Sequence, residues 1–333
     1  MLEPMATIYE VAALAGVSPA TVSRVFNGHT VSPEKVRLVQ EAAATLKFAP
    51  NRTARRLRNQ SSELIALLIP DIENPFFTAL ARGVEDRAQE AGYSVVLCNT
   101  DDDPAKETRY LEIAMSEGMA GVILAPAASD GDLAQIVAQG RPVVAVDRST
   151  GFDIDAVMVD NRAAGAAATT ALFDAGFRRV ACIAGPLGIE STEERYLGWR
   201  QVVAKRSDGT DSPEFLQHAN YRVDGGRAAM ATLLALETPP DAVVTTNNLM
   251  GVGALQVLAE AGIAPPAFGV AVVGDLPFTT FSTDVVTQVH LPARHLGVTA
   301  ASMLMDRIAG DTQPARIVVL RARIASDGEA ESL

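Results

Sequence analysis

Residues 7–28 have the sequence TIYEVAALAGVSPATVSRVFNG, and this stretch decides how the N-terminal part of the chain folds. Thr7, followed three residues later by Glu10, has the pattern of a capping box that starts a helix. Gly16 permits a turn with a positive φ, and Ser18-Pro19 is a capping residue followed by a proline at the first position of a second helix. The stretch therefore predicts two short helices joined by a tight turn.

Apolar residues at helical spacing predict which sides of these helices are buried. The predicted buried residues are Ile8, Val11, Ala12 and Leu14 in the first helix, and Val22, Val25 and Phe26 in the second. Ser32-Pro33 repeats the cap-and-proline pattern and predicts a third helix that extends through Leu46. Three helices of this kind fit any small bundle, so the pattern alone leaves DNA binding open.

Charge separates this N-terminal segment from the rest of the chain. Residues 1–62 hold eight Lys/Arg and four Glu, whereas the whole chain has 28 Lys/Arg, 40 Asp/Glu and a formal net charge of −12. A small basic module on a large acidic body is typical of a protein whose N-terminal part contacts phosphate groups and whose body does not. The charge distribution therefore favours a nucleic-acid-binding head.

The basic residues concentrate in residues 50–58, PNRTARRLR, which are too short to form a stable helix alone. Taken alone, this segment is equally compatible with a solvated linker. Together with residues 17–28, however, Ala54-Arg55-Arg56-Leu57 resembles the lactose-repressor (LacI/GalR) family of bacterial transcription regulators. In that family the second helix lies in the major groove, and a short hinge helix orders on the operator with its leucine wedged into a central base step.

The resemblance assigns base contacts to the second helix and the wedge to Leu57, for which a buried leucine at a domain junction is the alternative. Arg24 is the strongest specificity candidate because a guanidinium can bind guanine bidentately, whereas Pro19 and Ala20 offer only apolar contacts. Arg55 is expected at phosphates or groove walls, which position the protein without specifying sequence. The predicted DNA-binding residues are Thr7, Ser18, Pro19, Ala20, Thr21, Ser23, Arg24, Asn27, Asn51, Ala54, Arg55 and Leu57.

Beyond the head, apolar runs alternate with amphipathic segments, as expected of parallel sheets covered by helices. The predicted strands are residues 64–69, 93–98, 121–124, 142–146, 180–184, 242–246 and 270–273, and predicted helices include 77–91, 249–261 and 162–175 with Asn161 as its cap. The family resemblance extends over this region and implies the α/β fold of periplasmic sugar-binding proteins, with two doubly wound parallel-sheet lobes. In such sheets, ligands bind at the carboxyl ends of the strands.

Polar and aromatic residues follow these strands, and the resemblance is to a ribose-type pocket. The predicted effector-binding residues are Asn74, Phe76, Phe77, Asp147, Arg148, Ser191, Arg195, Tyr221, Asn247, Asp275 and His290. Each also has an ordinary interpretation: adjacent phenylalanines are usually core, Asp147-Arg148 fits a surface ion pair, and Asn247 fits a helix cap. Two departures from the family matter. The loop at 274–277 is shortened, which leaves a one-residue ambiguity for Asp275, and position 290 is histidine instead of glutamine. We therefore expect a monosaccharide or related polyol.

The expected organisation is a helix-turn-helix domain at 5–50, a hinge helix and linker at 51–62, one effector lobe at 63–161 with 293–320, a second at 162–292 with 321–326, and a disordered tail at 327–333. Effector binding would shift the closure of the lobes and thereby the spacing of paired hinge helices. One head contacts only a few base pairs, so a homodimer on a pseudo-palindromic operator is expected. The acidic C-terminal residues lack the leucine heptads of tetrameric relatives.

Other classes of protein fit less well. The four histidines lack metal-ligand spacing, the two cysteines form no CxxC, and Asp101-Asp102-Asp103 fits a helix start better than a metal site. We therefore expect no enzyme, cofactor or metal. The chain shows no secretion signal or membrane span, so we expect a cytoplasmic protein that is nucleoid-associated on its operator, and not a periplasmic solute-binding protein. A regulator with a protein corepressor stays an alternative.

Overall fold

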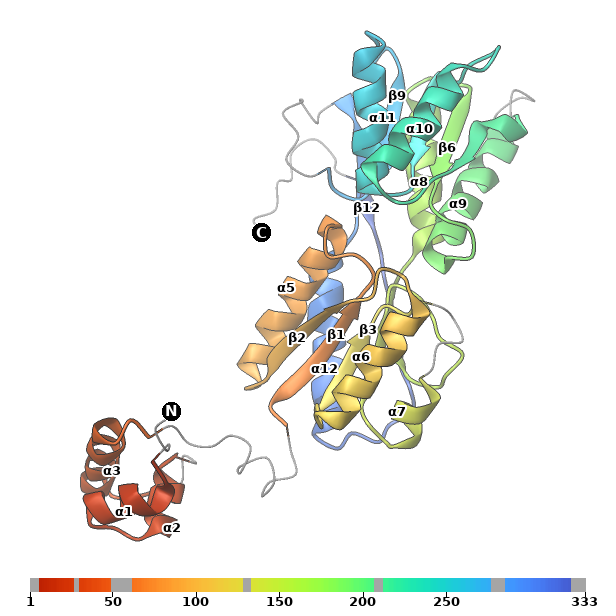
Figure 1. The fold of residues 1–333 in the computed structure, drawn as a ribbon. Coiled ribbons are helices and arrows are strands. Elements are labelled where there is room, and N and C mark those ends of the chain that lie inside the picture. Colours follow the sequence, from red (N-terminus) through yellow and green to blue (C-terminus); the bar gives the residue numbers. More distant parts are fainter. Residues whose placement is uncertain are drawn as a thin grey trace. The chain divides into compact units, whose positions relative to one another are not determined.

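The computed structural model describes residues 6–26, 30–48, 62–127, 133–206, 212–276 and 285–324 (Figure 1). The chain separates into two compact units, residues 1–61 and residues 62–333, which we call the head and the body. Each is described by itself below.

The described part of the head contains helices α1 (Ile8–Ala15), α2 (Pro19–Phe26) and α3 (Pro33–Thr45). The predicted capping box is confirmed: Thr7 N donates to Glu10 Oε2 at 2.6 Å, and Glu10 N donates to Thr7 Oγ1 at 3.4 Å. Gly16 ends α1 with a φ of 63°, as a glycine permits. Val11 and Val22 are fully buried and pack these helices into one small core.

Two predictions for the head are wrong in detail. Leu14 is 55% exposed, whereas Ala15 is buried. The reason is the helical period, since Ile8, Val11, Ala12 and Ala15 lie on one face and position 14 falls beside it. Ser32 precedes α3 without any hydrogen bond from its side chain to the helix, so Pro33 alone marks that start.

The described part of the body contains two six-stranded sheets, each with its own helices, which we call the first and second lobes. In the first, the order is β11-β5-β4-β3-β1-β2, with all pairs parallel; in the second it is β12-β10-β9-β8-β6-β7, with only β12 antiparallel. The strands of the first lobe are β1 (Leu64–Ile69), β2 (Ser94–Asn99), β3 (Gly121–Leu124), β4 (Val143–Val146), β5 (Asp155–Val159) and β11 (Ile317–Leu320). Those of the second are β6 (Val180–Ala184), β7 (Leu216–His218), β8 (Ala242–Thr245), β9 (Gly269–Val273), β10 (Thr287–His290) and β12 (Arg323–Ile324).

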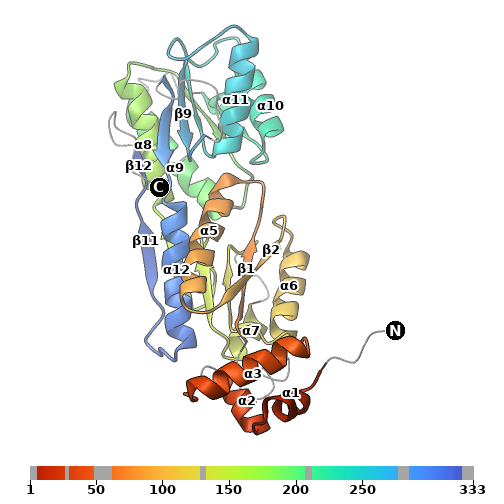
Figure 2. The same cartoon turned by 90° about the vertical axis from the view of Figure 1, so that its left-hand side faces the viewer.

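Helices cover both faces of the first sheet, because β1 is apolar on both sides. Ile65 and Leu67 pack in the core beneath α5 (Pro75–Glu90) and α12 (Ala293–Ile308), while Ala66 and Leu68 pack beneath α6 (Pro104–Ser116) and α7 (Ala134–Ala138) (Figure 2). In the second lobe, α8 (Asn161–Asp174) packs on α9 (Glu190–Arg206), and α10 (Val223–Leu234) packs on α11 (Asn248–Glu260). The short helix η1 (Pro213–Phe215) precedes β7. The predicted doubly wound α/β body is confirmed.

The seven predicted strands are all present to within about one residue, but the sequence analysis missed β5, β7, β10, β11 and β12. The strands β5, β7 and β10 contain polar or charged residues and β12 has two residues, so none of these four stands out as an apolar run. Ile317–Leu320 of β11 is an apolar run of four residues that was overlooked. The predicted cap of α8 is also wrong. Asp160 is the cap and accepts from Ala163 N at 3.0 Å, whereas Asn161 is buried and accepts from Arg195 Nε.

Within the described body, the chain passes between the sheets at three places: from β5 into α8, from β10 into α12, and from β11 into β12. The division into effector lobes at particular residues stays a prediction.

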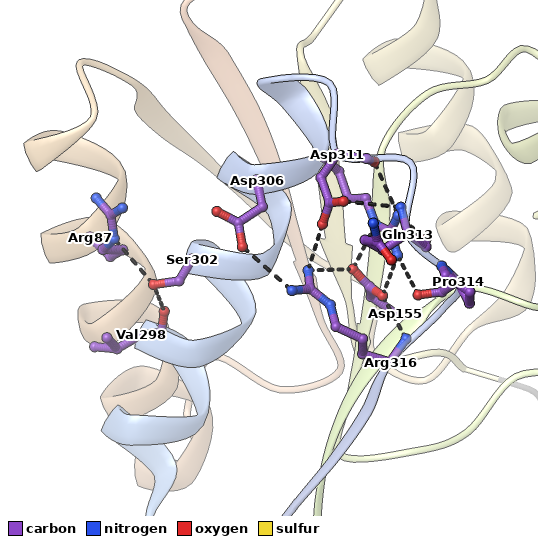
Figure 3. A network of polar contacts seen from close by, with 10 residues as sticks. Arg87, Asp155, Val298, Ser302, Asp306, Asp311, Gln313, Pro314 and Arg316 are labelled. Carbon is purple, nitrogen blue, oxygen red and sulfur yellow. Dashed lines mark hydrogen bonds and ion pairs between the residues drawn. The ribbon is translucent and has the colours of Figure 1, made fainter.

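A buried carboxylate fixes the junction of α12, β11 and β5 (Figure 3). The side chain of Asp155 is 0% exposed and accepts from Arg307 Nε and Nη2 at 2.9 and 2.8 Å and from Arg316 N at 2.8 Å. Asp306 and Asp311 lie 3.6 Å from the Arg316 guanidinium. Burial alone would raise the pKa of Asp155, but the hydrogen bonds from the two arginines outweigh it and hold this pKa below its usual range.

Asp155→Asn should lower the free energy of unfolding by about 1–3 kcal/mol at neutral pH, because two arginines lose their charged acceptor. A carboxyl with a depressed pKa stabilises the fold above its unfolded pKa of about 3.9 and loses that contribution as pH falls through the folded pKa. The difference between the variant and the native chain should therefore shrink below about pH 4. Urea unfolding at several pH values measures this; equal stability at pH 7 would contradict it.

Candidate functional site

A cavity of about 250 Å³ lies in the body where strands of both sheets end. It is lined by Pro70, Asp71, Asn74, Phe76, Phe77, Asp101, Asp102, Asp147, Arg148, Pro186, Ser191, Arg195, Asn220, Tyr221, Arg222, Asn247, Asn248, Val273, Gly274 and Leu291. Nine of the eleven predicted effector-binding residues are among them; Asp275 and His290 are not. Parallel strands bring their carboxyl ends to one edge, which explains how residues far apart in sequence meet here.

Arg148, directly after β4, is held in place by residues of its own lobe. Its Nη1 donates to Asp102 Oδ1 at 2.5 Å and to Pro126 O at 3.0 Å, and its Nη2 donates to Asp102 Oδ2 at 3.4 Å. Burial alone would lower the pKa of Arg148, but its contacts with Asp102 outweigh this and raise it. Asp147 has a φ of 65° and lies 3.5 Å, Oδ2 to Oγ, from Ser191 of the second lobe. The pair is thus buried at the cavity and is not the surface ion pair that the sequence also allowed.

Arg195 of α9 lines the cavity from the second lobe. It is 6% exposed, its Nε donates to Asn161 Oδ1 at 2.8 Å, and its Nη1 donates to Thr246 O at 2.7 Å. Neither acceptor is a carboxylate, so these hydrogen bonds orient the guanidinium without neutralising its charge. Asn161 begins α8, immediately after the chain has crossed from the first lobe. Arg195 therefore connects the crossing segment with the cavity.

Tyr221 and Asn247 form a third side of the cavity. Asn247 caps α11 by accepting from Met250 N at 2.8 Å, and its Nδ2 donates to Tyr221 O at 2.8 Å. The cap interpretation of Asn247 is thus confirmed together with its place in the lining. Tyr221 has a φ of 64°, its hydroxyl contacts Thr192 Oγ1, and burial raises its pKa.

The aromatic wall comes from the start of α5. Asn74 caps this helix by accepting from Phe76 N at 3.0 Å. The rings of Phe76 and Phe77 lie 5.0 Å apart at 84°, with Phe77 buried. Both phenylalanines line the cavity, although Phe77 also belongs to the core, as the ordinary interpretation of adjacent phenylalanines suggested.

Asp275 and His290 lie outside the cavity lining and contact each other instead. Their side chains are 61% and 43% exposed, and the hydrogen bond that His290 Nδ1 makes to the Asp275 carboxylate raises the pKa of His290. Val273 and Gly274 line the cavity in their place, because β9 ends one residue before the shortened loop.

Several lining residues were missed by the sequence analysis. Asp102 was interpreted only as part of a helix start, which holds for Asp103, whose side chain accepts from Ala105 N at 2.8 Å. Asn220 and Arg222 flank Tyr221 but follow the missed strand β7. The sequence feature that could have identified them is their position next to Tyr221, which was predicted to bind the effector.

The head presents a separate polar surface. Thr7, Ser18, Ala20 and Arg24 are exposed, and Pro19, Thr21 and Ser23 are half-buried. Ser18 caps α2 as predicted, accepting from Thr21 N at 3.2 Å. The predicted DNA-binding residues Asn27, Asn51, Ala54, Arg55 and Leu57 lie outside the described residues.

Each of the two units matches a known protein family. Residues 7–51 match the family of bacterial regulatory proteins, lacI family, and residues 62–325 match periplasmic binding proteins and sugar binding domain of LacI family. The chain is 36% identical over 318 residues to the ribose operon repressor of Escherichia coli (strain K12), covering 93% of this chain and 94% of that repressor.

Solved structures give the same result. The transcriptional regulator CelR–cellobiose complex matches with a TM-score of 0.71 and 31% identity over 96% of this chain and 98% of that one. The Lac repressor dimer bound to operator and the anti-inducer ONPF matches with a TM-score of 0.84 over 97% and 98% of the two chains; at 23% identity this likeness shows the fold alone.

The chain therefore belongs to the LacI family of bacterial regulatory proteins. It is a DNA-binding transcriptional regulator with a periplasmic-binding-protein-like body, and not an enzyme. No helix in the parts of the chain that the structure describes is long and apolar enough to cross a lipid bilayer.

A glycine contact sets the position of Arg195. A Cβ atom on Gly165 of α8 would lie 2.1 Å from Arg195 O, so α8 and α9 can approach this closely only with glycine there. Gly165→Ala should lower the free energy of unfolding by about 1–3 kcal/mol through overpacking, measured by urea unfolding. Helix propensity alone predicts the opposite sign, a gain of about 0.5–1 kcal/mol, so a stabilised variant would contradict the close contact.

Proposed function

We propose that this protein is a repressor that binds a pseudo-palindromic operator as a homodimer, and that an uncharged monosaccharide or related polyol bound in the body cavity switches its operator affinity. It would act in the cytoplasm, associated with the nucleoid when bound to operator. The observation that carries the effector proposal is the set of buried polar side chains, oriented by hydrogen bonds, around the cavity beside the Phe76 and Phe77 rings.

The charges of the cavity support an uncharged ligand. Four aspartates and three arginines are among the lining residues. Arg148 is paired with Asp102, and Arg222 with Glu73 and Asp71, whereas the hydrogen bonds of Arg195 go to the uncharged acceptors Asn161 Oδ1 and Thr246 O. A phosphorylated sugar would bring at least one negative charge next to four carboxylates, which costs electrostatic free energy. Hydroxyl groups of a neutral sugar can instead donate to the carboxylates and accept from the arginines.

Similarity narrows the effector class further. The relative with 36% identity is named for a ribose operon, and the CelR structure holds cellobiose. A pentose or other monosaccharide is therefore our first candidate, with Asn74, Phe76, Phe77, Asp147, Arg148, Ser191, Arg195, Tyr221 and Asn247 as its contacts. Asp275 and His290 stay candidates only for a conformation in which their pair opens toward the cavity.

The switch follows from the two lobes. A ligand that contacts both lobes favours one closure angle, and this shifts the population of conformations competent to bind operator. We expect the sugar to weaken operator binding, so that the protein is released from the operator. A regulator that uses a protein corepressor is the alternative, and we infer the sugar mechanism because the cavity is lined from both lobes.

Arg24→Ala should weaken specific operator binding by about 1–3 kcal/mol while leaving binding to random DNA less affected, because Arg24 is exposed on α2 and suited to bidentate guanine contact. The measurement is a fluorescence-anisotropy titration of both DNAs at one salt concentration. Arg37→Ala is the control, since Arg37 is an exposed arginine of α3 that pairs with Glu41. Equal losses on operator and random DNA for Arg24→Ala would refute a base contact.

Arg195→Ala should abolish the effector response without changing operator affinity in the absence of sugar, because the cavity loses the guanidinium that Asn161 Oδ1 and Thr246 O orient. Operator release as a function of sugar concentration measures this, with a melting curve to verify folding. Arg200→Ala is the control from the same helix, since Arg200 is exposed and donates from Nη1 to Tyr196 Oη at 3.3 Å. A variant that responds at native sugar concentrations would mean that the cavity is not the effector site.

A further inference from the structure

Arg222 forms ion pairs that cross from one lobe to the other. It precedes α10 in the second lobe, while Asp71 and Glu73 follow β1 in the first. Arg222 Nη1 donates to Glu73 Oε2 at 2.6 Å, and its Nη2 lies 3.5 Å from Asp71 Oδ2. Arg222 and Glu73 are 149 positions apart and belong to different lobes, each built on its own sheet. Their contact therefore exists only when the lobes are close together.

Both ends of this contact are held by local hydrogen bonds. Glu73 N donates to Asp71 Oδ1 at 2.9 Å, which fixes the acidic turn after β1. Arg222 N donates to Asn220 Oδ1 at 3.1 Å, and Asn220 Nδ2 donates to Asp224 Oδ1 at 3.2 Å, which fixes the start of α10. Less backbone entropy is therefore lost when the ion pairs form than if either segment were unconstrained.

The ion pairs lie at the rim of the cavity. The side chains of Arg222 and Glu73 are 45% and 71% exposed, whereas Arg148 and Arg195 are 6% exposed. The rim contact is thus distinct from the buried residues proposed to bind the effector. Two other hydrogen bonds between described residues join the lobes, from Ser149 N to Glu190 Oε2 at 2.6 Å and from Ser191 Oγ to Asp147 Oδ2 at 3.5 Å. Both have uncharged donors and so cannot substitute for the charge pairing.

We propose that Arg222 is a positioning residue of the effector site: its ion pairs with Glu73 and Asp71 hold the lobes partly closed before any ligand binds. This inference rests on the proposed function of the cavity as the effector site. Exposed ion pairs contribute little to folding stability. The balance between open and closed lobes, however, is a small free-energy difference, so such a pair changes the closed-to-open ratio by about two- to fivefold.

The test is single-molecule energy transfer on the full-length, ligand-free protein. One dye is attached at Glu112→Cys in α6 and one at Ala259→Cys in α11, both exposed positions on different lobes, while Cys98 and Cys182 are buried. Mixing with excess unlabelled protein keeps the dyes within one chain if the protein is a dimer. The ratio of closed to open molecules is then counted directly.

Arg222→Gln should lower the closed-to-open ratio by about two- to fivefold, and Arg222→Lys should restore most of it. The matched control is Arg227→Gln, because Arg227 lies on α10, which Arg222 precedes, and pairs at 2.8 Å with Glu260 inside the second lobe. Added NaCl should lower the ratio in the native chain but not in Arg222→Gln, since salt screens exposed charges. An unchanged ratio in Arg222→Gln, or an equal fall in Arg227→Gln, overturns the proposal.

D-ribose added to the same samples separates this inference from the proposed function. The ligand-free comparison decides the role of Arg222 by itself. If D-ribose raises the closed population in the native chain, it should do so in Arg222→Gln at about two- to fivefold higher concentration. The reason is that the ligand must then supply the free energy of closure that the ion pairs contribute in the native chain. An Arg222→Gln variant with the native D-ribose dependence overturns the role of Arg222 in effector binding. Other neutral sugars that do close the native chain serve in place of D-ribose in this comparison.

Discussion

The burial of the Arg195 guanidinium is the constraint on which the site in the body depends. A buried guanidinium needs hydrogen-bond acceptors, and it finds them in Asn161, where the chain enters the second lobe, and in the carbonyl of Thr246, just after β8. The close approach of α8 and α9 at Gly165 holds the backbone of Arg195 at this place. One side chain thus connects a crossing segment, a strand end and the cavity wall. Under the proposed function, a ligand that contacts Arg195 would act directly on the segment that joins the lobes.

The head and the body differ in net charge, and this difference fits their different partners. The head carries excess positive charge and exposes Arg24, as contact with DNA phosphates and base edges demands. In the body, by contrast, Arg148 and Arg222 are paired with carboxylates. The acidic body therefore offers little attraction to nucleic acid. Its polar groups suit a ligand with many hydroxyls, and we propose that the rim ion pairs of Arg222 act on closure.

Much of this organisation could be predicted from the sequence. The capping box at Thr7 and Glu10 and the apolar runs of the central strands are local signals, and they gave correct elements. Errors arose where the outcome depends on tertiary contacts. Leu14 lies next to the buried helix face, Asn161 turns inward to Arg195, and the short edge strands β11 and β12 form only because neighbouring strands are present. Asp102 and Arg222 escaped notice because their partners, Arg148 and Glu73, lie 46 and 149 residues away. The pair of Asp275 and His290 shows that a family position need not line the cavity when a loop is shortened.

The central claim is that the cavity binds an uncharged sugar, and a thermal-shift screen of the purified protein tests it most directly. A ligand that binds only the folded state must raise the melting temperature, by an amount that grows with the logarithm of its concentration once this exceeds Kd. Pentoses, hexoses and polyols would be compared with the corresponding sugar phosphates and with purines. The account predicts a concentration-dependent rise with at least one neutral sugar and none with its phosphate. A rise only with phosphorylated sugars or purines, or no rise with any compound in a protein that melts cooperatively, would contradict it.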